Sequence, residues 1–202
     1  MLTTKQRILK ISEKLFFEQG IANVRLQQIA DNSGISIGNL AYHFKNKEVI
    51  VEEVYNELLR ELAVLHSGKS RIESLKTVDD YFTAIYNFQQ ENGFYLNNFW
   101  EIERTYPKIK KVWQRLNNKM LQRLSDSINS NVENGNLKKA DFDEAYDLLA
   151  NSVLLTLNYR IPQQILRSKP VKELYFKQSL WNLLYPYFTP KGKREYKKLN
   201  IT

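Results

Sequence analysis

The residues best suited to chemistry lie in one stretch, residues 33–48, which reads SGISIGNLAYHFKNKE. It holds an amide, a phenol, an imidazole and two lysine ammonium groups in close succession. Amides and hydroxyls hydrogen-bond base edges, and ammonium groups pair with phosphates, so this set suits contact with nucleic acid. It does not suit a metal ion, because the chain has no cysteine and only two histidines, His43 and His66. We therefore expect no metal site.

Enzymatic catalysis finds no support elsewhere in the chain. The acidic run DFDE at 141–144 is typical of the first turn of a helix, where carboxylates complement the helix dipole, and not of a paired-carboxylate site. No glycine-rich phosphate loop is present. We expect no catalytic activity and no cofactor.

Composition indicates the class of fold and of partner. Among 202 residues there are only 7 glycines and 5 prolines, which favours helices over a sheet that needs frequent turns. The net charge of +8 favours a polyanionic partner. The absence of cysteine fits a reducing compartment, and neither a signal peptide nor an apolar run of about 20 residues is apparent. We expect a cytoplasmic protein that does not enter a membrane.

The spacing of apolar residues predicts the helices that position the reactive stretch. A helix over about 3–20 is followed by two short helices, at about 26–32 and 36–43, which are joined by a turn at Gly34. Two short helices joined through a glycine turn behind a longer helix are typical of a helix-turn-helix unit, whose second helix enters the major groove. A plain helical hairpin is the alternative reading.

The remaining chain is predicted to be all-α as well. A linking helix runs from about 46 to 66 and begins at Asn46, which can cap it. Longer helices, many rich in aromatic residues, are expected at about 70–91, 107–133, 141–160 and 170–188, with an interruption near Pro162. We expect a helix-turn-helix DNA-binding domain at 1–48 and a helical regulatory and dimerisation domain at 49–202.

Charge placement favours DNA binding over the plain hairpin. Arg25, Lys45 and Lys47 flank predicted helix starts, where a cation opposes the helix dipole unless an anion such as a phosphate docks there. On the second short helix, the outer face has little to bury and carries mostly small or hydrogen-bonding side chains, as entry into a groove requires: Ile37, Gly38, Asn39, Ala41 and Tyr42.

Several of these residues occur in a recognisable order. Ile29-Ala30, Ser33-Gly34-Ile35-Ser36, Gly38, Leu40, His43-Phe44 and Asn46-Lys47-Glu48 follow one another without a gap. In this order and spacing the chain resembles the DNA-binding domain of TetR/AcrR-family transcriptional repressors over about residues 3–60. The rest of the chain resembles that family only in size and helical texture.

The resemblance implies which side chains meet DNA. Gln27 and Asn39 would face the bases, where the amide of Asn39 suits adenine, and His43 and Lys47 would contact phosphates. The chain departs from the family at Ala41, where a tyrosine is usual and the aromatic comes one place later, and at Arg25, where a Ser or Thr cap is usual. The expected DNA-binding residues are Arg25, Gln27, Ser36, Ile37, Gly38, Asn39, Tyr42, His43 and Lys47.

The resemblance also implies roles for the larger half. The last two long helices would form a homodimer interface, with Leu154, Leu180, Trp181, Leu184 and Phe188 as the expected contacts. The central helices would hold a pocket for a small, mostly apolar effector, lined by Tyr81, Tyr86, Phe88, Tyr95, Phe99, Trp100 and Trp113.

Together these expectations describe a homodimeric transcriptional repressor that binds double-stranded DNA. It would bind a palindromic operator and be released when the effector favours a conformation in which the linking helix moves. The alternative is a helix-turn-helix dimer without an effector, either architectural or controlled by a protein partner.

Overall fold

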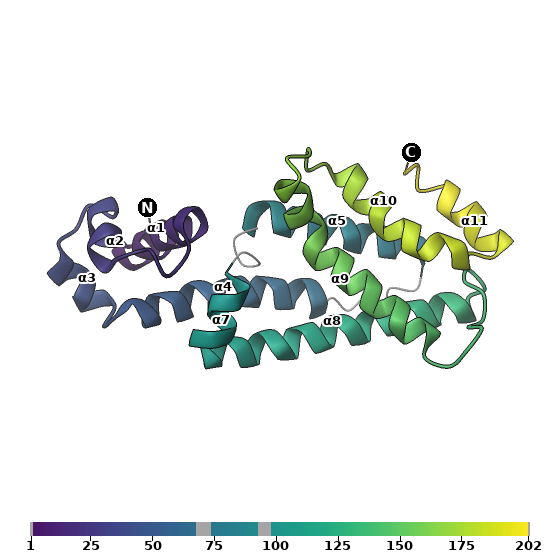
Figure 1. Cartoon of the computed structure of the whole chain (residues 1–202), viewed down its shortest axis with the longest axis horizontal. Coiled ribbons are helices and arrows are strands. Elements are labelled where there is room, and N and C mark those ends of the chain that lie inside the picture. Colours follow the sequence, from purple (N-terminus) through teal and green to yellow (C-terminus); the bar gives the residue numbers. More distant parts are fainter. Residues whose placement is uncertain (1, 68–73, 93–97, 202) are drawn as a thin grey trace. The chain divides into compact units, whose positions relative to one another are not determined.

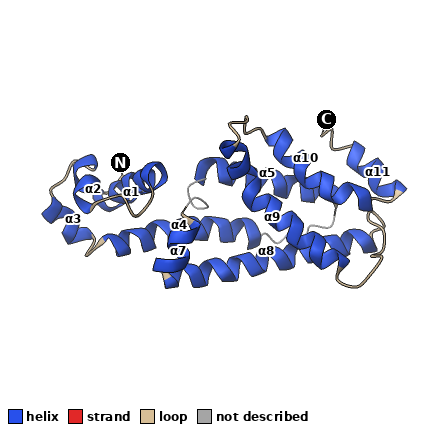
Figure 2. Cartoon of the chain, in the orientation of Figure 1, coloured by secondary structure: helices blue, strands red, loops and turns tan. Residues whose placement is uncertain are grey.

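The computed structural model describes residues 2–67, 74–92 and 98–201, and regular structure in these ranges is helical (Figures 1 and 2). The α-helices are α1 (Thr4–Gln19), α2 (Leu26–Asn32), α3 (Ile37–His43), α4 (Lys47–Ser67), α5 (Leu75–Asn92), α7 (Phe99–Thr105), α8 (Pro107–Glu133), α9 (Ala145–Leu166), α10 (Glu173–Leu184) and α11 (Pro190–Lys197). A short 3-10 helix, η1 (Tyr185–Tyr187), follows α10. The prediction of an all-α fold is confirmed.

Two compact units make up the chain. The first comprises residues 1–62 and 92–115, and the second comprises residues 63–91 and 116–202. Helices α7 and the beginning of α8 therefore belong with the N-terminal helices, although they are distant from them in sequence. The predicted functional boundary at residue 48 stays a prediction.

The first unit begins with a well-capped helix. Thr3 and Gln6 form a reciprocal capping box at the start of α1, which satisfies amide groups that a helix start leaves without partners. Ile8, Leu15 and Phe16 are buried on one side of α1. The helix ends at Gly20, whose φ of 78° lies in the region that glycine adopts without steric cost.

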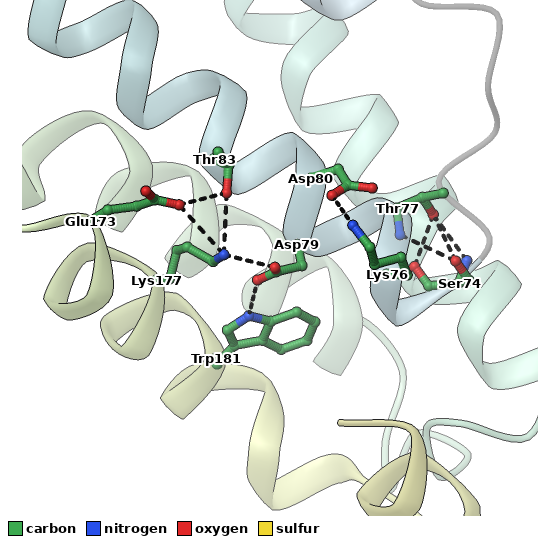
Figure 3. Close-up of polar contacts among 9 residues, drawn as sticks. All are labelled: Ser74, Lys76, Thr77, Asp79, Asp80, Thr83, Glu173, Lys177 and Trp181. Atoms are coloured by element: carbon green, nitrogen blue, oxygen red, sulfur yellow. Dashed lines mark hydrogen bonds and ion pairs between the residues drawn. The ribbon is translucent and has the colours of Figure 1, made fainter. Parts of the chain in front are cut away.

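The second unit contains a buried polar network between α5 and α10 (Figure 3). Lys177 on α10 donates to Asp79 Oδ2 on α5 at 2.7 Å, and Trp181 Nε1 donates to Asp79 Oδ1 at 3.0 Å. Lys177 also donates to Thr83 at 3.2 Å, while the Thr83 hydroxyl donates to Glu173 at 2.8 Å. A buried charge is tolerated only when it is paired and hydrogen-bonded, so this network fixes α10 on α5.

The interruption expected near Pro162 does not occur in the structure. The proline lies inside α9, which continues to Leu166. Proline removes one helical hydrogen bond, at a cost of about 3 kcal/mol in a helix interior. Here the helix continues because Ile161 and Gln164, on either side, are buried against the rest of the unit.

The basic segment near the end of the chain forms α11, which packs against other parts of the second unit. The Thr189 hydroxyl caps α11 by accepting the N–H of Gly192 at 3.1 Å, and it donates to the Gly135 carbonyl at 2.7 Å. The Tyr196 ring lies 5.3 Å from that of Trp181. A β-carbon at Gly192 would lie 2.1 Å from the Asn136 carbonyl oxygen, so only glycine fits this contact. The segment from Lys191 is therefore packed as part of the second unit.

Within the described residues no helix combines the length and apolarity that a membrane crossing needs. A cytoplasmic location stays an expectation.

Candidate nucleic-acid interface

Helices α2 and α3 are joined by a tight turn that the sequence specifies locally. Ser33 and Gly34 end α2, and the φ of 65° at Gly34 is the left-handed conformation expected of a glycine that closes a helix. The N–H of Ile35 donates to the Ala30 carbonyl at 3.1 Å. Ala30 is fully buried, and its small size allows the two helices to approach closely.

Ser36 caps the start of α3. Ser36 has an extended backbone, and its hydroxyl accepts the N–H of Asn39 at 3.1 Å. Leu40 and Phe44 leave only 1% of their surface exposed, so they hold α3 against the rest of the unit. Phe44 is therefore a core residue and not a surface contact.

The opposite face of α3 is turned to solvent. Tyr42 is 85% exposed and Ile37 is 43% exposed, and Gly38, Asn39 and Ala41 are exposed too. An added β-carbon at Gly38 would meet only the Ser36 hydroxyl at 3.9 Å, so the fold itself does not require glycine there. His43 is half-buried, and its ring packs edge-on against Tyr42 with the centroids 5.2 Å apart. This face can meet a groove without rearrangement of the core.

On α2 the two predicted contacts differ in their surroundings. Arg25 occupies the position before the helix and is exposed, and its side chain makes no capping hydrogen bond. Gln27 is also exposed, but its Nε2 donates to Asp31 Oδ1 at 2.7 Å, one turn further along α2. The amide of Gln27 would have to leave this partner to contact a base.

Lys47, which we expected to contact a phosphate, hydrogen-bonds the protein's own backbone. Its Nζ donates to three backbone carbonyl oxygens of the α1–α2 loop, those of Ile21 at 2.8 Å, Val24 at 3.0 Å and Ala22 at 3.4 Å. An ammonium group has three N–H donors, so this set accounts for all of them. The neighbouring Asn46 caps α4, as expected, by accepting the N–H of Val49 at 3.0 Å.

Two residues of α7 and the turn before it, Glu101 and Asn98, hold the same loop and were not predicted as functional. Asn98 Oδ1 accepts the N–H of Ile21 at 3.3 Å, and Glu101 Oε2 accepts the N–H of Ala22 at 3.1 Å. Sequence reasoning could not connect them with the loop, because 77 and 79 residues separate the partners. Their local sequence carries no motif that would mark them.

The residues predicted to line an effector pocket do not share one environment. Tyr81 and Phe88 are buried in the second unit, Tyr86 is half-buried there, and Trp100 in the first unit is 68% exposed. Trp113 is half-buried in the first unit, whereas Tyr95 and the side chain of Phe99 lie outside the described residues. The pocket therefore stays a prediction.

An apolar cavity does occur in the second unit, but it is lined by other residues. Its volume is about 20 Å³, which holds about one water molecule. Its lining consists of Leu75, Val78, Phe82, Leu124, Ser127, Ile128, Asn131, Leu137, Val153, Leu184 and Phe188.

The residues predicted for a dimer interface are core residues of their own protomer. Each of the five is at most 6% exposed: Leu154, Leu180, Trp181, Leu184 and Phe188. A side chain buried within its own chain has little surface left for a second chain. The exposed apolar residues of the same helices are different ones, namely Leu148, Leu155, Tyr159, Ile165 and Leu166 on α9 and Leu174 and Tyr175 on α10.

The described part of the chain contains no group of three or more acidic or histidine side chains placed to hold a metal ion. The fold and the exposed face of α3 thus define a helix-turn-helix DNA-binding module joined to a helical bundle.

Comparison with known proteins identifies the family. Residues 8–54 match the model of the bacterial regulatory proteins of the tetR family, and residues 54–196 match the model of a bacterial transcriptional repressor, TetR. The chain belongs to the TetR family of bacterial transcriptional regulators, and its helix-turn-helix domain is the family's DNA-binding domain.

Individual relatives are more distant. The HTH-type transcriptional repressor KstR2 of Mycolicibacterium smegmatis is 33% identical over 76 residues, which are 35% of this chain and 37% of that protein. The chain spans less than half the length of the curated relatives that it matches here.

Solved structures share the fold. A TetR-family regulator from Marinobacter aquaeolei VT8 has a TM-score of 0.84 at 20% identity, covering 98% of this chain and 97% of that one. The SmeT–triclosan complex has a TM-score of 0.63 at 18% identity and covers 93% of this chain and 92% of that one.

Proposed function

We propose that the protein is a homodimeric transcriptional repressor that binds a palindromic operator and is released by a small, mostly apolar effector. The observation that carries the DNA-binding part is the exposed face of α3, where Asn39 and Tyr42 project from a helix that Leu40 and Phe44 anchor. The description of the second matching family model as a transcriptional repressor supports repression.

The contacts proposed at DNA follow from exposure. Asn39 reads a base edge, and its amide can pair with adenine in two hydrogen bonds. Ile37, Gly38 and Tyr42 lie beside it on the exposed face, and Arg25 and Ser36 stand at the starts of α2 and α3, where amide groups and cations favour a phosphate. Gln27 and His43 lie at the edges of this surface.

Dimerisation is supported by an apolar stripe on α9. Leu148, Leu155, Tyr159 and Leu166 are between 49% and 86% exposed. Together with Ser152 and Pro162 they alternate at spacings of four and three residues, which is the seam of helices that pack side by side. A two-fold dimer would bury this stripe and place two copies of α3 on two half-sites.

The dimer can be tested on this stripe. Leu155→Glu places a charge in the seam and should convert the protein to monomers in sedimentation experiments. Gln114→Glu adds the same charge at an exposed position of α8, away from this stripe, and should leave the dimer intact. A dimeric Leu155→Glu variant would show that the interface lies elsewhere.

The effector part of the proposal rests on two observations. The interior of the second unit is largely apolar, and SmeT, which shares the fold, has been solved in a complex with triclosan. The apolar cavity described above is too small for such an effector as it stands. The alternative is a dimer that no small molecule controls. Thermal shift against a panel of apolar and aromatic compounds separates the two, because a ligand of the folded state raises the melting temperature.

Selection of binding sites from a random DNA duplex library at near-physiological salt tests the central proposal. A palindrome with half-sites about one helical turn apart, or a multiple of it, would support a specific dimeric regulator. Recovery of no consensus, with only salt-sensitive binding, would contradict operator recognition.

A further inference from the structure

The α1–α2 loop, residues 20–25, is held from two directions within the first unit. From α4, Lys47 donates to the carbonyl oxygens of Ile21, Ala22 and Val24. From the other direction, Asn98 and Glu101 accept the N–H groups of Ile21 and Ala22. We call Lys47, Asn98 and Glu101 the loop brace.

The brace extends from the core to the surface, because its contacts to Ile21 are buried or partly buried, whereas the contact of Glu101 with Ala22 is exposed. Asn98 is only 6% exposed, and its contact with the N–H of Ile21 is buried. Ile21 and Val24, whose backbone groups the brace contacts, are buried as well. The backbone of a loop needs hydrogen-bond partners when it is buried, and here long-range side chains supply them.

The loop leads directly into the DNA-binding helices. It ends at Arg25, the residue before α2, and α2 is packed through Ile29 and Ala30 and joined to α3 by the turn at Gly34. The position of the loop therefore sets where α2 begins and how α2 and α3 are presented together.

We propose that the loop brace positions the helix-turn-helix for DNA. Lys47 then acts as a positioning residue and not as a phosphate contact. Glu101 favours DNA binding although it carries a negative charge. The inference rests on the proposed function, because it concerns the same DNA-binding surface. It also gives α7 a direct connection to the α1–α2 loop, separate from the continuous path through α4.

The salt dependence of DNA binding distinguishes a positioning lysine from a phosphate contact. Each lost phosphate contact lowers the slope of log K against log salt by about 0.9. Lys47→Met should weaken operator binding roughly tenfold with an unchanged slope, and hydrogen exchange at residues 20–25 should accelerate. A slope lower by about 0.9 per protomer, with unchanged exchange, would overturn the role of Lys47.

Two further variants keep this test decisive. Lys47→Arg preserves the charge, but the planar guanidinium does not reproduce an ammonium group that points at three carbonyls, so it should fail to restore tight binding. Full recovery by arginine would instead favour a phosphate contact. Lys45→Met removes an exposed cation two residues away and should leave exchange in the loop unchanged.

Glu101 gives the sharpest test, because the two explanations predict opposite signs. If only charge matters, removing a carboxylate strengthens binding to a polyanion. If the brace matters, Glu101→Ala should weaken operator binding roughly fivefold to tenfold, and Glu101→Gln, which retains an acceptor oxygen, should restore part of the affinity. Glu103→Ala is the control, because Glu103 carries the same charge two residues further along α7 and pairs with Lys110. This variant should not weaken binding.

Amide exchange at Ile21 and Ala22 in the protein without DNA separates failure of the brace from failure of the proposed function. Faster exchange in Glu101→Ala, with weaker operator binding, supports the inference. Operator binding that stays as tight as in the wild type, or exchange that does not change, overturns it. If the wild type selects no operator at all, the proposed function fails, while the exchange result still decides whether the loop is held by α7.

Discussion

At the residue scale, the exposed face of α3 is costly for a protein that has no partner there. A tyrosine side chain contributes to stability mainly when it is buried, yet Tyr42 is 85% exposed. Gly38 lies four residues before Tyr42 on the same helix, and the fold does not require a glycine there. A glycine weakens a helix by about 0.5–1 kcal/mol relative to alanine. Both features are explained if this surface is shaped for DNA.

Asn39 should determine one base in each half-site. Asn39→Ala is expected to relax base preference at that position, with a loss of about 1–3 kcal/mol in discrimination, because two hydrogen bonds to adenine disappear. Binding-site selection with the variant measures this directly. Tyr42→Ala is the comparison, because we expect Tyr42 to contact the phosphate backbone of DNA. Its loss should therefore weaken binding to all DNA sequences alike. An unchanged consensus for Asn39→Ala would show that another residue reads this position.

Two glycines should respond oppositely to the same substitution. Gly192→Ala places a β-carbon 2.1 Å from the Asn136 carbonyl oxygen, so α11 must shift and the melting temperature should fall. Gly38→Ala makes only an ordinary contact with the Ser36 hydroxyl, at 3.9 Å, so it should raise the free energy of unfolding by about 0.5–1 kcal/mol. The added methyl group should weaken DNA binding by crowding the groove. Chemical denaturation and operator titration check both. A stable, fully folded Gly192→Ala protein would contradict the docking of α11.

At the scale of the elements, the α5–α10 network decides how firmly α10 is held. Lys177 and Asp79 are 13% and 9% exposed, so neither charge can be left alone without a large penalty. In contrast, the ion pair of Lys76 and Asp80 on α5 is well exposed (Figure 3).

Removing one member of the buried pair should therefore be far more damaging than removing one of the exposed pair. Lys177→Met is expected to lower the free energy of unfolding by about 3–5 kcal/mol, because Asp79 stays buried without its cation. Lys76→Met should cost at most about 1 kcal/mol. Urea denaturation of both variants measures the difference. Similar values for the two would mean that the buried pair is hydrated in solution.

Alkaline pH should weaken the junction of α7 and α8. Burial raises the pKa of Tyr106 to about 12, and the nearby carboxylates of Glu101 and Glu48 add to this shift. A tyrosine whose pKa is raised on folding contributes stability that is complete below the unfolded value of about 10 and is lost as pH rises toward 12.

Unfolding free energies measured across this range should fall more steeply for the wild type than for Tyr106→Phe, which cannot ionise. Identical pH profiles would show that the hydroxyl is solvated in the folded protein. Tyr55→Phe is a useful second variant, because burial also raises the pKa of Tyr55.

The comparison of sequence and structure follows the range of the interactions. The Ser36 cap, the turn at Gly34 and the helices from α1 to α4 were predictable, since their contacts join residues three to five positions apart. Lys47 was not, because its partners are carbonyl groups 23 to 26 residues earlier in the chain. The fit of Gly192 against Asn136 and the burial of Trp181 likewise depend on how helices meet, which apolar spacing does not reveal.

At the scale of the whole molecule, the exposed stripe on α9 predicts that folding and association are linked. If two chains bury the stripe, the melting temperature should rise with protein concentration, because mass action favours the dimer. Differential scanning calorimetry over a hundredfold range of concentration checks this. Leu155→Glu should abolish the dependence, whereas Gln114→Glu should retain it. A wild-type melting temperature that is independent of concentration would contradict an association linked to folding.

The membership of α7 in the first unit bears on the construction of chimeric regulators. A graft that transfers only residues 1–62 to a relative's body would bring the loop without Asn98 and Glu101, and the amide groups of Ile21 and Ala22 would meet whatever side chains the host supplies. A transplant that also carries residues 92–115 keeps the loop and its partners together. The transferable DNA-binding unit of this protein is therefore discontinuous in sequence, and a chimera should exchange residues 1–62 and 92–115 together.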